Sequence, residues 1–145
     1  MNPAQITLVQ NTFNLIEPIA EIAAGLFYNR LFELDPSLKP MFKNDIKEQG
    51  KKLMQALAFV VKGLKKPDTI IPVLQDMGCG HVRYGVQDAH YDTVGAALLW
   101  TLEKGLGEEA WTAEVEEAWT AAYGLISHVM KETASEVTEV AVLAR

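Results

Sequence analysis

Apolar residues recur along this chain at the 3.6-residue spacing of an α-helix and almost nowhere at the alternating spacing of a β-strand. The pattern predicts an all-α protein. One apolar row runs through Ile70, Leu74 and Met77, and the next position on the same helix face is His81. An imidazole in an apolar interior is either satisfied by a hydrogen bond or bound to a metal, and the row alone leaves both readings open.

Prolines, glycines and capping residues divide the pattern into seven or eight expected helices. Helices this short cannot form a simple four-helix bundle of 145 residues, and they suit an irregular helical sandwich with crossing angles of about 50°. We find no internal repeat, so we expect one domain over residues 1–145. The expected boundaries are a cap at Asn2 with Gln5, a break at Pro18, a stop at Asp35-Pro36, a capping box at Asp45 with Glu48, caps at Asp68 and Asp88, a stop at Gly107 and a cap at Thr112.

The composition restricts the class of partner. The formal net charge of −6 argues against nucleic acid or an anionic membrane surface. No apolar run approaches the roughly 20 residues of a membrane-spanning helix, and the first residues do not resemble a secretory leader. We therefore expect a cytoplasmic protein. Cys79 is the single cysteine, so neither an intrachain disulfide nor a two-cysteine haem attachment is expected.

Two further polar residues lie in apolar rows on other expected helices. Tyr28 lies on an apolar face of the second expected helix, and Gln49 is the first residue of the apolar row on the next long helix. Gly50 comes directly after it, and a glycine inside a helix usually marks the close approach of a second helix. Ala24 and Gly25 are both small enough to be the partner. The sequence thus places a phenol, a carboxamide and an imidazole toward the interior from three different helices.

These positions resemble the globin family over essentially the whole chain, with the greatest similarity to bacterial single-domain haemoglobins and to the globin module of flavohaemoglobins. The spacing of the prolines, of one loop aromatic and of the inward histidine carries the resemblance. The matching segments are Phe27-Tyr28, Asp35-Pro36, Pro40-Met41-Phe42, Gln49-Gly-Lys-Lys-Leu53, His81, His90-Tyr91 and Trp119-Thr-Ala-Ala-Tyr123-Gly124, of which Trp119 and Tyr123 are expected to serve packing. The resemblance implies the globin fold around a haem pocket, with haem b (iron protoporphyrin IX) held without covalent bonds.

The resemblance also implies a role for each pocket residue. His81 matches the proximal iron ligand, and its second ring nitrogen is expected to donate to a backbone carbonyl or a hydroxyl. Phe42 matches the aromatic that stacks on the porphyrin, although ordinary core burial would also explain it. Tyr28 and Gln49 match the hydrogen-bonding pair on the opposite, distal side. The remaining expected contacts are Leu53, which would crowd the bound gas, Val86 and Leu98 at the haem edge, and Lys52 and Arg83, which are either propionate partners or solvated surface cations.

Two donors above the iron imply tight, reversible binding of O2, with NO and CO as further ligands. A hydrogen bond to a charged acceptor contributes about 1.5–3 kcal/mol, so one donor would slow O2 release about ten- to a hundredfold. Slow release suits oxygen storage, scavenging or sensing better than routine transport. A further alternative is a haem-free, globin-like sensor domain, and the inward position of His81 argues against it.

An enzymatic alternative uses the same pocket. It is a nitric oxide dioxygenase, in which Tyr28 and Gln49 would be the catalytic residues and NO would be oxidised to nitrate. We expect no reductase module in these residues, so turnover would need a separate reductase as partner. One departure weakens the comparison with flavohaemoglobins. Tyr91 matches a tyrosine that supports the proximal histidine there, but Ala134 stands at the position of their supporting glutamate.

Overall fold

The fold is helical throughout the part of the chain that is described. A computed structural model describes residues 1–42, 45–83 and 86–143, and all side chains among these except those of 82–83 and 136–143. The elements are α1 (Pro3–Ile16), η1 (Glu17–Ile19), α2 (Ala20–Leu34), η2 (Pro36–Met41), α3 (Ile46–Lys62), α4 (Pro67–Arg83), α5 (Asp88–Ala110) and α6 (Ala113–Leu143).

The described residues form six α-helices, where the sequence predicted seven or eight helices. The segments at the predicted breaks are short 3₁₀ turns: η1 contains Pro18, and η2 contains Pro36 and Pro40. Proline has no backbone N–H, so a short segment that contains it builds the α-helical hydrogen-bond ladder poorly. The helix expected to stop at Gly107 continues to Ala110 across a kink, where the glycine takes a φ of +81°.

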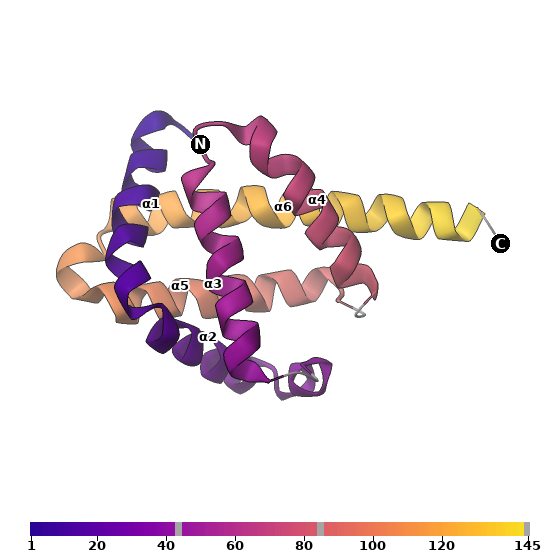
Figure 1. Ribbon diagram of the computed structural model, residues 1–145, viewed down its shortest axis with the longest axis horizontal. Coiled ribbons are helices and arrows are strands. Elements are labelled where there is room, and N and C mark those ends of the chain that lie inside the picture. The colour runs from indigo at the N-terminus through magenta and orange to yellow at the C-terminus, as the bar shows by residue number, and fades with distance from the viewer. Residues whose placement is uncertain (43–44, 84–85, 144–145) are drawn as a thin grey trace.

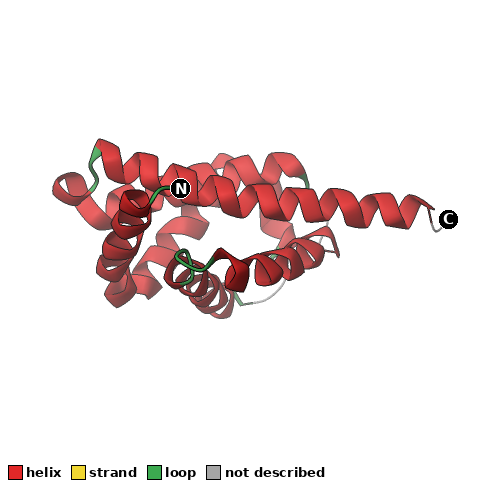
Figure 2. Ribbon diagram, turned by 90° about the horizontal axis from the view of Figure 1, so that it is seen from above, coloured by secondary structure: helices red, strands yellow, loops and turns green. Residues whose placement is uncertain are grey.

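The helices form a crossed arrangement. In Figure 1, α5 and α6 run side by side, and α1, α3 and α4 cross them, while α2 packs on α5 and α3. Both views show the C-terminal part of α6 extending beyond the other helices (Figures 1 and 2). None of the helices in the described residues is long and apolar enough to cross a membrane.

Two predicted helix starts are confirmed. Asn2 forms the expected capping box, with its side-chain oxygen accepting from the Gln5 N–H at 2.8 Å. The Thr112 hydroxyl accepts from the Val115 N–H at 3.2 Å at the start of α6. Short polar side chains at these positions satisfy backbone N–H groups that have no partner within the helix.

The predicted capping box at Asp45 is half correct. Its carboxylate accepts from the Lys47 N–H at 2.9 Å and caps α3. Glu48 was expected to complete the box, but its carboxylate pairs instead with the Lys51 ammonium at 3.6 Å. A glutamate at this position can accept from the backbone N–H of the capping residue or pair with a lysine three residues later. The sequence pattern does not decide between these two partners.

The predicted caps at Asp68 and Asp88 are wrong. Asp68 is the second residue of α4, which begins at Pro67. Asp88 is the first residue of α5, and Gln87 caps that helix together with His90, whose Nδ1 accepts from the Gln87 N–H at 2.9 Å. Carboxylates are favoured throughout the first turn by the helix dipole, so an acidic residue locates a helix start only to within a residue or two.

The core lies where α1, α5 and α6 meet and continues between α2 and α3. Its largest fully buried side chain is Trp119, whose indole N–H donates to the Thr12 hydroxyl at 2.8 Å and so keeps a buried donor satisfied. The largest side chains with less than 2% exposure are Trp119, Phe13, Ile16, Leu31, Ile70, Leu74, Leu102 and Val9.

The close approach predicted at Gly50 is confirmed. A Cβ at this position would lie 3.0 Å from the Cβ of Ala24, so α2 and α3 touch here. Gly25, the other partner considered, has no atom within 4 Å of its own Cβ position. The contact fixes the relative height of α2 and α3, and therefore of Tyr28 and Gln49, which these helices carry.

Candidate functional site

Three of the predicted site residues meet where α2, η2 and α3 come together. Tyr28 is 3% exposed, and its ring packs edge-on against Phe42 with the ring centroids 5.4 Å apart. The Tyr28 hydroxyl donates to the backbone carbonyl of Gln49 at 3.5 Å, which is the outer limit of a hydrogen bond. Phe32 completes an aromatic cluster, 5.5 Å from Phe42. The phenol is thus held firmly by its ring and only weakly by its hydroxyl.

His81 lies on α4 at the end of the predicted apolar row. Ile70 and Leu74 are fully buried, and His81 itself is half-buried. Its Nδ1 lies 3.2 Å from the hydroxyl oxygen of Tyr91 on α5, one of the two kinds of partner expected from the sequence. For Nε2, the structure gives no hydrogen-bond partner among the described residues. One ring nitrogen is therefore engaged and the other is available.

The remaining predicted residues are only partly brought together. Leu53 and Leu98 line one small apolar cavity of about 10 Å³ between α2, α3 and α5. Val86 packs against the core, and its N–H donates to the backbone carbonyl of His81 at 3.0 Å. Lys52 is exposed on α3. Arg83 ends α4, and its side chain lies outside the described part of the chain.

The imidazole and the phenol belong to separate groups of side chains. Helix α4 packs chiefly on α6, and α3 packs chiefly on α2. Within the described residues, no hydrogen bond or aromatic contact connects His81 to Tyr28, Phe42 or Gln49. Several apolar side chains pack against the core but are only partly buried, among them Phe42, Leu53, Met77 and Val86. The helices that carry the two groups do not pack closely on each other. A flat cofactor between the imidazole and the phenol would require such a separation.

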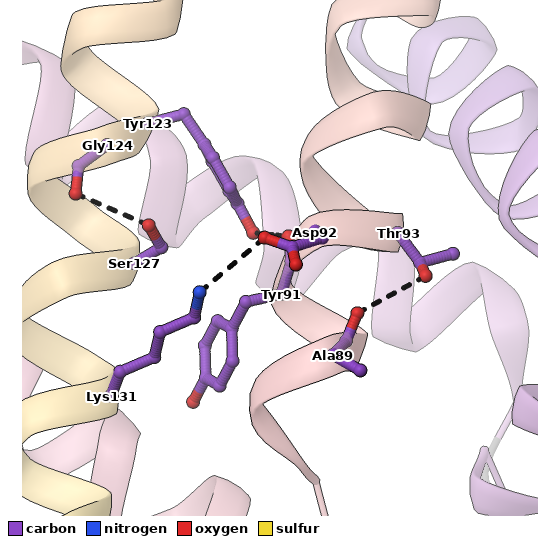
Figure 3. A network of polar contacts seen from close by, with 8 residues as sticks. All are labelled: Ala89, Tyr91, Asp92, Thr93, Tyr123, Gly124, Ser127 and Lys131. Carbon is purple, nitrogen blue, oxygen red and sulfur yellow. Dashed lines mark hydrogen bonds and ion pairs between the residues drawn. The ribbon is translucent and has the colours of Figure 1, made fainter.

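Tyr91 is held in place from α6 by a contact that the sequence pattern does not predict. The hydroxyl of Tyr123 donates to the backbone carbonyl of Tyr91 at 2.6 Å (Figure 3). Gly95 makes room for this ring, because a Cβ there would lie 2.7 Å from Tyr123 Cε2. Tyr123 was expected to serve packing, and it also donates a hydrogen bond. The available sequence clue was Gly95, one helical turn beyond Tyr91 and facing the tyrosine of α6.

Burial determines the protonation of the three polar side chains. Desolvation raises the pKa of Tyr28 to about 12, and the nearby Gln49 side chain offsets only part of this. Burial also raises the pKa of Tyr91, with a further contribution from the Asp88 carboxylate. For His81, burial lowers the pKa below its ordinary 6.5. At neutral pH both phenols therefore carry their protons as potential donors, and the imidazole is neutral, the form that can bind a metal.

The Globin family model matches residues 25–130 of the chain. The chain belongs to the globin family. The expected resemblance is thereby confirmed, and membership of this family implies a haem cofactor.

The known proteins that this globin resembles include flavohemoproteins and a bacterial globin. A flavohemoprotein of Xylella fastidiosa is 30% identical over 141 residues, which cover 95% of this chain and 35% of that protein. The chain spans about a third of the length of the curated relatives it matches. A bacterial globin from Campylobacter jejuni has a TM-score of 0.82 at 23% identity, over 95% of this chain and 99% of its own.

A second solved structure has a similar fold. It is an engineered carbene transferase from Rhodothermus marinus, derived from a candidate nitric oxide dioxygenase. Its TM-score is 0.85 at 25% identity, over 100% of this globin and 99% of its own chain.

The lowered pKa of His81 predicts an acid-sensitive stability of the haem-free globin. Between pH 6.5 and the lower folded-state pKa, the unfolded chain binds the proton more readily, so stability falls as the pH falls through this window. Above pH 6.5 this contribution to stability is fully retained. Denaturant unfolding at about pH 7.5 and about pH 5.5 should therefore show a larger loss of unfolding free energy for the unaltered chain than for His81→Gln. The exposed His128→Gln should keep the larger loss, and equal losses in all three proteins would contradict the assignment.

Proposed function

We propose that this globin holds haem b, without covalent bonds, between His81 and the pair Tyr28–Gln49, and that it binds O2 tightly and reversibly, with NO and CO as further ligands. The observation that carries the proposal is the state of His81: Nδ1 is engaged by the Tyr91 hydroxyl at 3.2 Å, and Nε2 is available. Metal-bound histidines usually donate their second ring nitrogen in this way, which fixes the tautomer and the ring plane.

The donor set fits a porphyrin better than a metal ion held by side chains alone. In the described part of the chain, no three His, Cys, Asp or Glu residues gather as a metal cluster. His81 would thus be the one protein ligand on its side, and the other donors would come from the cofactor. Haem supplies four ring nitrogens and an iron that takes up diatomic gases.

The walls of the proposed pocket follow from the positions of the apolar residues. Phe42 would stack on the ring, because it is partly buried and fixed by its contacts with Tyr28 and Phe32. Leu53 and Leu98 would shape the pocket from α3 and α5, and Val86 would close its edge beyond α4. Lys52 and Arg83 are proposed for the propionates, with Lys52 exposed on α3 and free to reach the rim.

Tyr28 is proposed as the principal donor to the bound gas. Its pKa of about 12 keeps the phenol protonated, and its bond to the Gln49 carbonyl is long at 3.5 Å. The hydroxyl therefore loses only a weak hydrogen bond when it turns to a better acceptor. A gas that carries partial negative charge when bound, as O2 does, gains about 1.5–3 kcal/mol from such a donor, and CO gains much less.

Haem binding is tested by reconstitution with hemin. The purified chain should bind hemin one-to-one and show the absorption spectrum of a histidine-ligated haem. His81→Ala should reduce haem retention roughly tenfold or more, since it removes the one protein ligand. His128→Ala, an exposed histidine on α6, should retain haem fully. A chain that stays colourless with hemin would overturn the cofactor, and full retention by His81→Ala would overturn the ligand.

The donor role of Tyr28 is tested by the Tyr28→Phe variant, which removes the hydroxyl and keeps the ring. Stopped-flow measurements should show O2 dissociating about ten- to a hundredfold faster, by the loss of one hydrogen bond to a charged acceptor. CO dissociation serves as the internal control and should change less than about twofold. Equal acceleration of both gases would mean that the side chain acts through its bulk and not through its hydroxyl.

A second candidate function is nitric oxide dioxygenase activity. It is favoured by the likeness to the Rhodothermus protein and to flavohemoproteins. The reaction joins NO and O2 to nitrate with one electron per turnover, so it needs a reductase outside these 145 residues. The distal pair Tyr28–Gln49 would hold O2 for the reaction with NO.

The enzymatic function is tested with an NO electrode in the presence of O2, NADPH and a purified flavin reductase. An enzyme should consume many equivalents of NO at a constant rate and form equal amounts of nitrate. Tyr28→Phe should lower that rate about tenfold or more, because O2 is held less well. Consumption that stops after one equivalent, although the reductase returns the haem to the ferrous state, would leave gas binding as the function.

A further inference from the structure

A lysine lies beside the tyrosine that supports His81. The ammonium nitrogen of Lys131 on α6 is 6.0 Å from the ring centroid of Tyr91. It is also 3.5 Å from the Asp92 carboxylate, and Figure 3 shows its side chain extending from α6 past the Tyr91 ring. Its side chain is 31% exposed, whereas that of Asp92 is 83% exposed. The lysine side chain is thus partly buried, whereas the side chain of its counter-ion is exposed.

Tyr91 is in direct contact with the imidazole of His81. Its hydroxyl is 3.2 Å from Nδ1 of His81, and its backbone carbonyl is fixed by the Tyr123 hydroxyl at 2.6 Å. If Nε2 binds a metal, Nδ1 carries the proton and donates it to the Tyr91 oxygen. The strength of that hydrogen bond then depends on how good an acceptor the phenol oxygen is.

A cation near an aromatic ring is attracted by the electron density of the ring and draws that density toward itself. The phenol oxygen loses density as a result and becomes a poorer acceptor. The carboxylate of Asp88 acts in the opposite direction and contributes to the raised pKa of Tyr91, and the Asp92 carboxylate pairs with the ammonium. The effect of Lys131 is therefore the difference that removal of its charge alone would make at the Tyr91 ring.

We propose that Lys131 is a positioning residue that acts on His81 through Tyr91: its ammonium weakens the Tyr91 hydroxyl as an acceptor for Nδ1–H and so limits how strongly the imidazole donates electrons to a bound metal. The proposal rests on haem binding by His81. The Asp92 carboxylate anchors the lysine on the same helix turn as Tyr91, and Tyr123 holds that turn against α6.

The test compares Lys131→Met, which keeps the length of the side chain and removes its charge, with the unaltered holoprotein. Loss of the cation should strengthen the Nδ1–H bond, raise the iron–histidine stretching frequency of the ferrous form in resonance Raman spectra and favour ferric over ferrous haem. We expect the ferric-to-ferrous ratio to rise about threefold, which is a fall of about 28 mV for one electron.

Two variants separate the charge from a merely structural role. Lys131→Arg keeps the cation. It should therefore change the stretching frequency and the reduction potential by only a small fraction of the changes that Lys131→Met causes. Lys104→Met removes a second lysine that lies beside an aromatic ring, 5.8 Å from the ring centroid of Trp100, and should leave both unchanged. Thermal melting of the three variants checks that each is folded.

The outcomes are distinct from those of the proposed function. If the unaltered chain does not bind hemin, or binds it without an iron–histidine band, the function proposed for His81 fails. If that band is present and Lys131→Met moves neither the band nor the potential, or if Lys104→Met moves them equally, the role of Lys131 is overturned. A shift with Lys131→Met that Lys131→Arg restores would support it.

Discussion

The hydrogen bond between Nδ1 of His81 and the Tyr91 hydroxyl is the contact on which the proposed pocket depends. Helix α4 packs chiefly on α6 and has little direct contact with α5, so this bond is the main tie between the imidazole and α5. Tyr123 then ties the same turn of α5 to α6. Three helices thereby meet at one tyrosine. The arrangement fixes the plane of the imidazole while leaving Nε2 available, which packing alone would not achieve.

The opposite side of the pocket is positioned by close packing. At Gly50, α3 comes so close to α2 that a Cβ would lie 3.0 Å from the Ala24 Cβ, and the edge-on contact of Tyr28 with Phe42 holds the phenol ring. A rigid ring with a weakly held hydroxyl is well suited to a gas pocket, because the donor needs no large movement to reach its ligand. The two sides therefore rely on different interactions: the His81 side on directed hydrogen bonds, and the Tyr28 side on van der Waals contact between small and flat groups.

Periodicity and helix punctuation predicted the helical class, the ends of α1 and α2, and the buried row that leads to His81. They could not assign which of two neighbouring polar residues caps a helix, so Asp88 was chosen where Gln87 acts. Nor could they find the bond from Tyr123 to Tyr91, because periodicity shows which face a residue occupies and not which atom it meets across a helix pair. Such contacts depend on the crossing of α5 and α6, which single-helix patterns do not contain.

The choice between a gas binder and a dioxygenase depends less on Tyr28 and Gln49 than on what lies behind His81. Both functions use the same pair of donors, so the distal geometry does not separate them. The resemblance to flavohaemoglobins implies a carboxylate at the position of Ala134, and among the described side chains of α6 the cation of Lys131 lies near the Tyr91 ring. The effect proposed for Lys131 favours ferrous haem, the form that binds O2 reversibly. That proposal is therefore also an argument for gas binding as the first function, with catalysis dependent on how fast an external reductase delivers electrons.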